Sequence, residues 1–330
     1  MAFKDISGNS HVKKILTLAL ERKRVPNSLL FWGQDGVGKK RTALTLAKAL
    51  NCRRKTNDAC DDCDHCRAIE DRRFPDVIEI APERNVLKID QIKFIKQIAY
   101  LRPLTGEKKV FLVLEAEKMN EDAGNALLKI LEEPPLSSHI ILITRNLYLI
   151  LPTIQSRCQI LGFSPIRKEE TEVILREKGY AEEQAKLISI LAEGNLEQAL
   201  GLEWEAVQAQ RKEAWDFLLS LLQGRNSSSF LRRFAYSQRW VVGEDLIQTL
   251  KMFSSFFRDF ILIKERGDAR YLLNPDFESD LRSAEGHISR DQAMDHLRRV
   301  DEALLAIPRN MNINLVASSI FSDIGDLRNG

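Results

Sequence analysis

Short apolar runs alternate with helical patterns along the first half of the chain. The run Lys109–Leu114 is apolar almost throughout, which is typical of a central parallel strand that is buried on both faces. Segments with apolar residues at helical spacing, such as 121–132, separate the runs. This alternation predicts an α/β domain over residues 1–164, in which helices flank a parallel sheet. The five runs that we expect to be strands are 29–32, 76–80, 109–114, 139–144 and 159–163.

The second half of the chain is helical in pattern. Three short helical segments in 165–203 predict a small helical region, and the longer segments in 204–330 predict an all-α C-terminal domain in which 267–288 is a long loop. Four phenylalanines recur at helical spacing and favour the core of a helix bundle over a contact with a partner subunit. They are Phe253, Phe256, Phe257 and Phe260. The expected long helices are 206–222, 229–236, 244–265, 289–307 and 313–324.

Positive and negative charges nearly balance, with 49 Lys and Arg against 47 Asp and Glu, for a formal net charge of +2. A chain without a strong positive field lacks the electrostatic drive for non-specific DNA binding, so we expect any nucleic-acid contact to come from local patches or from partners. No apolar run approaches the roughly 20 residues of a membrane span, and the first residues lack a signal-peptide core. We therefore expect a globular, cytoplasmic protein that does not enter a membrane.

The segment from Gly33 to Thr42 has the order of a phosphate-binding loop, since it follows an apolar strand and precedes a helix. Gly33, Gly36 and Gly38 permit the backbone conformations that aim amide N–H groups at phosphate oxygens, and Lys39 supplies a cation. The next position normally carries a hydroxyl that holds Mg²⁺, but here it is Lys40, and Thr42 lies two residues too far along. The loop is thus expected to suit phosphate binding better than hydrolysis.

Four of the five cysteines fall within a short polar stretch, at Cys52, Cys60, Cys63 and Cys66. Four thiolates at this spacing predict a tetrahedral structural zinc site, which would supply the folding energy of a loop with few apolar residues. The alternatives are free reduced cysteines or a redox pair. Because four cysteines fill the coordination shell, we expect His65 to be a solvated loop residue and the metal not to be catalytic.

Taken in order, these motifs resemble the clamp-loader branch of the AAA+ ATPases, closely over about residues 3–200 and loosely beyond. The segments that carry the resemblance are G-Q-D-G-V-G-K, the four cysteines, A-E-K-M-N, N-A-L-L-K-I-L-E-E-P-P, S-R-C and, more weakly, R-N-M-N-I-N-L. The resemblance implies an AAA+ domain with an inserted zinc module, a helical lid and a C-terminal helical collar that joins subunits.

The resemblance also assigns roles to single residues. It implies that Arg157 is an arginine finger that reaches the ATP site of a neighbouring subunit; the alternative is a surface arginine in a local ion pair. Thr144 and Asn146 fall near the first sensor position, with strand capping as an equal alternative. Glu197 falls where active relatives place a sensor arginine.

The same alignment places Leu114 where active relatives need an aspartate for Mg²⁺, directly before Glu115, which suits the role of the base that activates water. Cys158, outside the cysteine cluster, is expected to be packed rather than reactive.

These departures favour a non-hydrolysing subunit of the bacterial DNA polymerase III clamp loader, which by itself is not an enzyme. The implied partners are gamma/tau and delta subunits, with the sliding clamp and primer-template DNA reached through the complex. Two alternatives remain: an active motor of the gamma/tau or replication-factor type, and a zinc-dependent DNA-binding protein. Whether ATP is retained as an inert ligand also stays open, because the glycines and Lys39 could hold it without Mg²⁺.

Overall fold

The computed structural model describes residues 2–55, 57–223, 243–307 and 313–325. The chain divides into two compact units, Met1–Gly179 with Ala192–Leu200, and Tyr180–Leu191 with Gly201–Gly330. The three-part division expected from the sequence, at 1–164, 165–203 and 204–330, stays a prediction. The helix expected at 229–236, and most of the segment 309–315, lie outside the described residues.

The first unit is built on a five-stranded parallel sheet with the strand order β2-β3-β4-β1-β5. All five strands predicted from the apolar runs are present, and no bound is shifted by more than one residue. Because β4 lies between β3 and β1 and all three strands are parallel, the loops that follow β1, β3 and β4 meet at the carboxyl edge of the sheet. The strands are β1 (Ser28–Trp32), β2 (Val77–Ile80), β3 (Lys109–Val113), β4 (Ser138–Thr144) and β5 (Gln159–Gly162).

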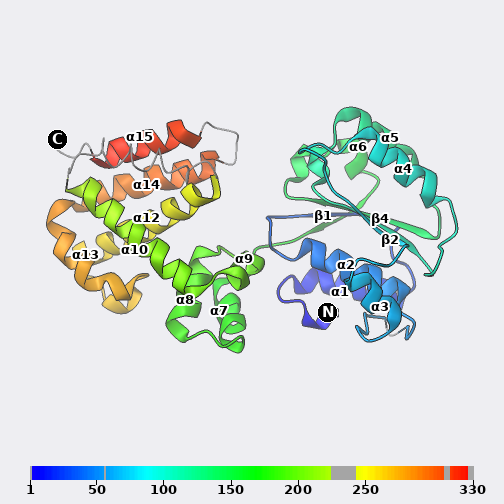
Figure 1. The fold of residues 1–330 in the computed structure, drawn as a ribbon, viewed down its shortest axis with the longest axis horizontal. Helices are drawn as coiled ribbons and strands as arrows, with labels where there is room; N and C mark the ends of the chain where they lie inside the picture. The colour runs from blue at the N-terminus through cyan, green and yellow to red at the C-terminus, as the bar shows by residue number, and fades with distance from the viewer. Residues whose placement is uncertain (1, 56, 224–242, 308–312, 326–330) are drawn as a thin grey trace. The chain divides into compact units, whose positions relative to one another are not determined.

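Helices cover both faces of this sheet (Figure 1). One face packs against α1 (Ser10–Glu21), α2 (Lys39–Asn51) and α3 (Asp64–Glu70). The other packs against α4 (Ile89–Ala99), α5 (Glu121–Glu132) and α6 (Pro152–Gln155). Successive strand residues point to opposite faces, so Phe31 joins the first core and Leu30 the second. Burial on both faces explains why the strands are apolar without alternation.

Two short helices complete the first unit: α7 (Lys168–Glu177) and most of α9 (Leu196–Gly201). The Gly8 amide donates to the Glu170 carboxylate at 3.0 Å, which ties α7 to the segment before α1. The Ile166 amide donates to the Gly194 carbonyl at 3.1 Å. The first bond holds α7, and the second holds the segment before α9, against the rest of the first unit.

The second unit is a helical bundle around one apolar core. The phenylalanine stripe lies fully inside it, with Phe253, Phe256, Phe257 and Phe260 all at 0% exposure, which confirms that the stripe is a bundle core. Among the described residues, no helix is both long enough and apolar enough to span a bilayer. The helices are α8 (Glu182–Leu191), α10 (Trp204–Leu222), α12 (Gly243–Lys264), α13 (Glu278–Ala284), α14 (Arg290–Ala306) and α15 (Ile313–Gly325).

The prediction of a long loop at 267–288 is wrong, because this segment forms α13 and three 3₁₀ helices. A buried polar network orders it. Asp259 accepts hydrogen bonds from the amides of Leu273 and Asn274, both at 2.8 Å, and buried Arg211 pairs with Asp276 at 2.7 Å. These contacts come from α10 and α12, outside the segment itself, so its local pattern does not reveal them.

Candidate functional site

The phosphate loop connects β1 to α2 and adopts the backbone that its glycines predict. Gly33, Gly36 and Gly38 have φ angles of +147°, +71° and +91°, in the region that side-chain-bearing residues rarely adopt. Gly38 is the N-cap of α2, so the loop opens directly into the first turn of a 13-residue helix. The local geometry is that of an anion cradle at a helix N-terminus.

The Lys39 side chain folds back onto its own loop. Its buried ammonium donates to the Gly33 carbonyl at 2.5 Å and to the Gln34 carbonyl, and it lies 3.8 Å from the Asp35 carboxylate. Burial lowers the pKa of the Lys39 ammonium, while the negative charges of Asp35 and Glu117 offset part of this effect. The cation that is expected to meet phosphate is therefore held by groups of the chain itself.

The next two side chains of interest on α2 offer no metal ligand at the loop. Lys40 forms an ion pair with Glu79 of β2, with 2.8 Å between Nζ and Oε2. Thr42 is buried, and its amide donates to the Gly38 carbonyl within the helix. The hydroxyl that normally holds Mg²⁺ is thus replaced by an ammonium that is bound elsewhere.

The end of β3 lacks a metal-binding carboxylate at the expected place. Leu114 packs against the apolar core on the α2 face of the sheet. Glu115 follows in the left-handed region, with φ +48°, and its exposed carboxylate pairs with Lys118. A leucine side chain has no oxygen to offer a metal ion, so both positions expected to organise Mg²⁺ are altered.

Sequence reasoning missed two charged residues beside the loop, Glu117 and Arg145. The Glu117 side chain is only 5% exposed, and its Oε1 accepts from Arg145 Nε at 3.1 Å. Arg145 Nη1 lies 3.5 Å from Asp35 of the phosphate loop. Glu117 follows the end of β3, and Arg145 follows the end of β4. Charged residues after the carboxyl ends of parallel strands are candidates for a binding site, so their position in the sequence could have identified them.

The two sensor candidates bond to each other and to the local backbone. Thr144 is buried at the end of β4, and its hydroxyl donates to the Asn146 carbonyl at 3.1 Å. The Asn146 side chain accepts from the Tyr148 amide at 3.0 Å and so caps the 3₁₀ helix that follows β4. These contacts match the strand-cap alternative, and a sensor role stays a prediction.

Asn195, at the start of α9, lies directly against the phosphate loop. Its side chain accepts from the Gln198 amide at 2.8 Å, which caps the first turn of the helix. A Cβ atom placed on Gly36 would lie 1.6 Å from Asn195 Oδ1, so the two residues are in close contact. Glu197, the residue at the expected second-sensor position, is exposed in the first turn of α9.

Arg157 follows α6, and its side chain turns back towards the end of α5. Its Nη2 and Nε lie 2.7 and 3.0 Å from the same oxygen of Glu132, and its Nη1 donates to the Thr153 carbonyl at 3.0 Å. About a third of the arginine side chain stays exposed. Next to it, burial raises the pKa of the Cys158 thiol to about 12, which agrees with a packed, unreactive cysteine.

The four clustered cysteines converge although they come from three places in the chain. Their sulfur atoms all lie within 4.8 Å of one another, and those of Cys60 and Cys66 are 3.9 Å apart. Two ligands of a tetrahedral zinc site are about 3.8 Å apart for Zn–S bonds near 2.3 Å, so the cluster fits this metal. Although burial opposes it, hydrogen bonds from the amides of Cys66 and Arg53 lower the pKa of the Cys63 thiol to about 6. The donor set suits a structural metal ion.

Buried side chains attach this cysteine module to the domain. Lys48 of α2 forms ion pairs with Asp61, at 2.8 Å, and with Glu70 of α3. The expectation that His65 is a solvated loop residue is wrong. His65 lies on α3, its ring packs against Phe74 with centroids 5.0 Å apart, and its Nδ1 lies 2.8 Å from the Asn51 carbonyl oxygen.

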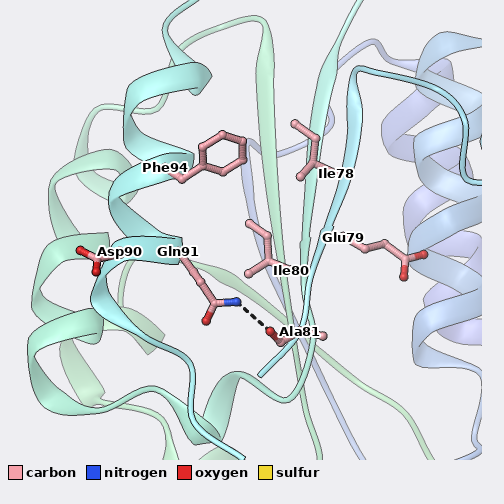
Figure 2. Close-up of a pocket in the computed structure, with 7 residues that line it drawn as sticks. All are labelled: Ile78, Glu79, Ile80, Ala81, Asp90, Gln91 and Phe94. Carbon is pink, nitrogen blue, oxygen red and sulfur yellow. Dashed lines mark hydrogen bonds between the residues drawn. The ribbon is translucent and has the colours of Figure 1, made fainter. Parts of the chain in front are cut away.

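A hollow of about 350 Å³ lies at the outer edge of the sheet, between β2 and α4 (Figure 2). Ile78, Ile80 and Phe94 line it, and Gln91 donates to the Ala81 carbonyl at 2.8 Å. In Figure 2 the Glu79 side chain points away from these residues, towards the helices on the opposite face. The hollow contains none of the residues that the sequence singled out.

Comparison with known proteins agrees with this architecture. A family model described as "DNA polymerase III, delta subunit" matches residues 8–167. The chain is 28% identical over 306 residues to DNA polymerase III subunit delta' of Bacillus subtilis, and the match covers 92% of each protein. It is 37% identical over 213 residues to subunit tau of Escherichia coli, covering 62% of this chain and 33% of that protein. The chain therefore spans about a third of the tau subunit.

Among solved structures, a DNA polymerase III gamma subunit-related protein of Thermotoga maritima is similar with a TM-score of 0.51 and 21% identity. The match covers 95% of this chain and 98% of that one. Together with the parallel sheet, the phosphate loop, the cysteine cluster and the helical C-terminal region, this likeness confirms the predicted AAA+ fold class.

Proposed function

Because the chain is similar to DNA polymerase III clamp-loader subunits, we propose that it is a non-hydrolysing member of a bacterial clamp loader. In this proposal it occupies the place of delta' and helps to put the sliding clamp on primed DNA. The full-length similarity to a delta' subunit supports this place in the complex.

The proposal rests on the residues at the two positions that should organise Mg²⁺ and on the contacts that these residues make. Lys40 is bound to Glu79, and Leu114 is partly buried and packs against the core. A base at Glu115 has little effect on a triphosphate that no metal polarises, and that carboxylate is paired with Lys118. The ATP-hydrolysing chemistry then belongs to a neighbouring subunit.

Arg157 is the residue through which this chain contributes to that chemistry. A guanidinium stays charged at all relevant pH values, and its planar fork matches phosphate oxygens. The contact with Glu132 is a partly exposed ion pair, a class whose net stabilisation is about 0–1 kcal/mol. Release of Arg157 towards a neighbour's triphosphate therefore requires little free energy.

The four cysteines hold a structural Zn²⁺ ion in this proposal. All four coordination positions are filled by protein, so the metal fixes the loop between α2 and α3 and leaves no position for a substrate. The proposed partners are gamma/tau and delta subunits, with clamp and primer-template DNA contacted through the assembled loader in the cytoplasm.

A single-turnover ATPase assay on the isolated chain with Mg²⁺ tests the absence of hydrolysis. We expect no phosphate release above that of the Lys39→Ala variant. Phosphate release that depends on Lys39 would favour the second candidate, an ATPase motor of the gamma/tau type. The 37% identity to a tau subunit supports this candidate.

A further inference from the structure

Four charged side chains meet at the phosphate loop, and they neutralise one another. Lys39 and Arg145 are the cations, and Asp35 and Glu117 are the anions. Arg145 contacts both anions, at 3.5 Å to Asp35 and 3.1 Å to Glu117. Lys39 lies 3.8 Å from Asp35 and within the electrostatic reach of Glu117.

We propose that Asp35 and Glu117 are specificity-determining residues that exclude a nucleoside triphosphate from the phosphate loop by occupying its two cations. A phosphate loop binds anions because backbone N–H groups and a lysine present uncompensated positive charge. Here the loop itself contains Asp35, and Glu117 lies beside it. A bound triphosphate would place its negative charge next to these two carboxylates, which would repel it. The loop thus keeps its shape and loses its attraction for phosphate.

The two carboxylates differ in burial, and therefore in how strongly each would repel a bound triphosphate. The Asp35 side chain is 68% exposed, so water screens much of its field. The Glu117 side chain is 5% exposed, and its Oε2 is buried without a hydrogen-bond partner among the described residues. A buried charge is screened far less than an exposed one, so Glu117 provides the larger part of the repulsion and Asp35 the smaller.

The contact between Gly36 and Asn195 adds a steric element to the same site. The capped first turn of α9 rests on the loop, where a Cβ on Gly36 would overlap Asn195. Glu197 is in that turn and adds another exposed carboxylate to α9. Removal of charge at Asp35 and Glu117 leaves this packing intact, so the electrostatic and steric contributions are separable.

The test is equilibrium binding of ATP to the full chain, by calorimetry, with and without Mg²⁺. The variants are Asp35→Asn, Glu117→Gln and the double variant. Both substitutions are isosteric, and circular dichroism checks that each variant is folded. Glu121→Gln, at an exposed position in the first turn of α5, makes the same change in net charge as either single variant, away from the loop.

We expect the double variant to bind ATP at least about tenfold more tightly than the unaltered chain, with most of the gain from Glu117→Gln. Glu121→Gln should bind as the unaltered chain does, and adding Lys39→Ala to the double variant should abolish the gain. Equal affinity of the unaltered chain and the folded double variant, whether tight or undetectable, overturns the inference. It rests on the proposed function only for the choice of ATP as ligand, because the role of Arg157 in a neighbour's site is tested in the assembled loader and does not depend on this result.

Discussion

Arg157 directs two of its donors, Nη2 and Nε, to a single oxygen of Glu132, at 2.7 and 3.0 Å. Glu132 is the last residue of α5, and Arg157 directly precedes Cys158 at the start of the segment that leads into β5. The ion pair holds the guanidinium at the surface in one orientation and leaves Nη1 on the Thr153 carbonyl. The guanidinium is thus ordered by contacts within this chain.

Substitutions at Gly36 and Gly38 distinguish the effect of backbone strain from the effect of a steric overlap at the phosphate loop. Both have positive φ, but a Cβ on Gly36 would overlap Asn195, whereas a Cβ on Gly38 would meet nothing within 4 Å. We expect Gly38→Ala to lower the free energy of unfolding by about 1 kcal/mol, and Gly36→Ala by about 2–4 kcal/mol. Urea denaturation measures both, and equal effects would show that α9 does not rest on the loop.

The cysteine cluster predicts one zinc ion per chain. Metal analysis of purified protein should give about one equivalent, and Cys63→Ser should lose most of it, because three thiolates and a hydroxyl bind Zn²⁺ less tightly than four thiolates. Hydrogen exchange at 52–66 should rise in this variant, with α5 as an unaffected internal reference. Cys158→Ser is the matched control, since Cys158 lies outside the cluster. Full zinc content in Cys63→Ser would contradict the proposed site.

His296 predicts acid sensitivity of the helical unit. It packs against Phe257, and neither ring nitrogen has a hydrogen-bond partner among the described residues. Burial lowers the pKa of His296, with Asp295 and Asp323 opposing and Arg299 reinforcing the shift. The unfolded chain, with a pKa near 6.5, therefore binds more protons than the folded chain in the window from about pH 6.5 down to the lowered pKa, so stability falls as pH falls through it.

His296→Phe should remove part of this dependence, at most about 1.4 kcal/mol per pH unit. Urea denaturation at about pH 7.5 and about pH 5.5 measures it. Burial also lowers the pKa of His139 in the first unit, so some acid sensitivity should persist in the variant. His287→Asn, at an exposed position, is the control. A pH dependence identical to that of the unaltered chain would exclude His296 as its source.

Features written in consecutive residues could be predicted from the sequence. The glycine loop, the cysteine spacing and the five apolar runs are local patterns, and the structure places them as expected. The charge cluster around Lys39 could not be predicted in the same way, because its members follow three different strands and meet only once the sheet orders them. The helices in 267–288 depend likewise on Arg211 and Asp259, which reach the segment from other helices.

The alternative that Arg157 forms a local ion pair could likewise be assessed only from the fold. Glu132 is 25 residues away in the chain, and its contact with Arg157 follows from the packing of α6 beside α5. The sequence identified the arginine through its resemblance to clamp loaders, and the structure adds the carboxylate that holds it. Both descriptions are compatible if Arg157 exchanges Glu132 for a neighbour's phosphate.

The most direct test of the account measures ATP turnover in a reconstituted loader in which the subunit beside this chain carries the one intact ATP site. With Arg157→Ala, we expect DNA-stimulated turnover at that site to fall by about 10³-fold, as arginine fingers in other phosphoryl-transfer systems indicate. Glu132→Gln, which frees the arginine, should keep turnover at or above the unaltered level. An unchanged rate with Arg157→Ala in an assembled, DNA-bound loader would contradict the central claim that this chain acts on its neighbour's ATP.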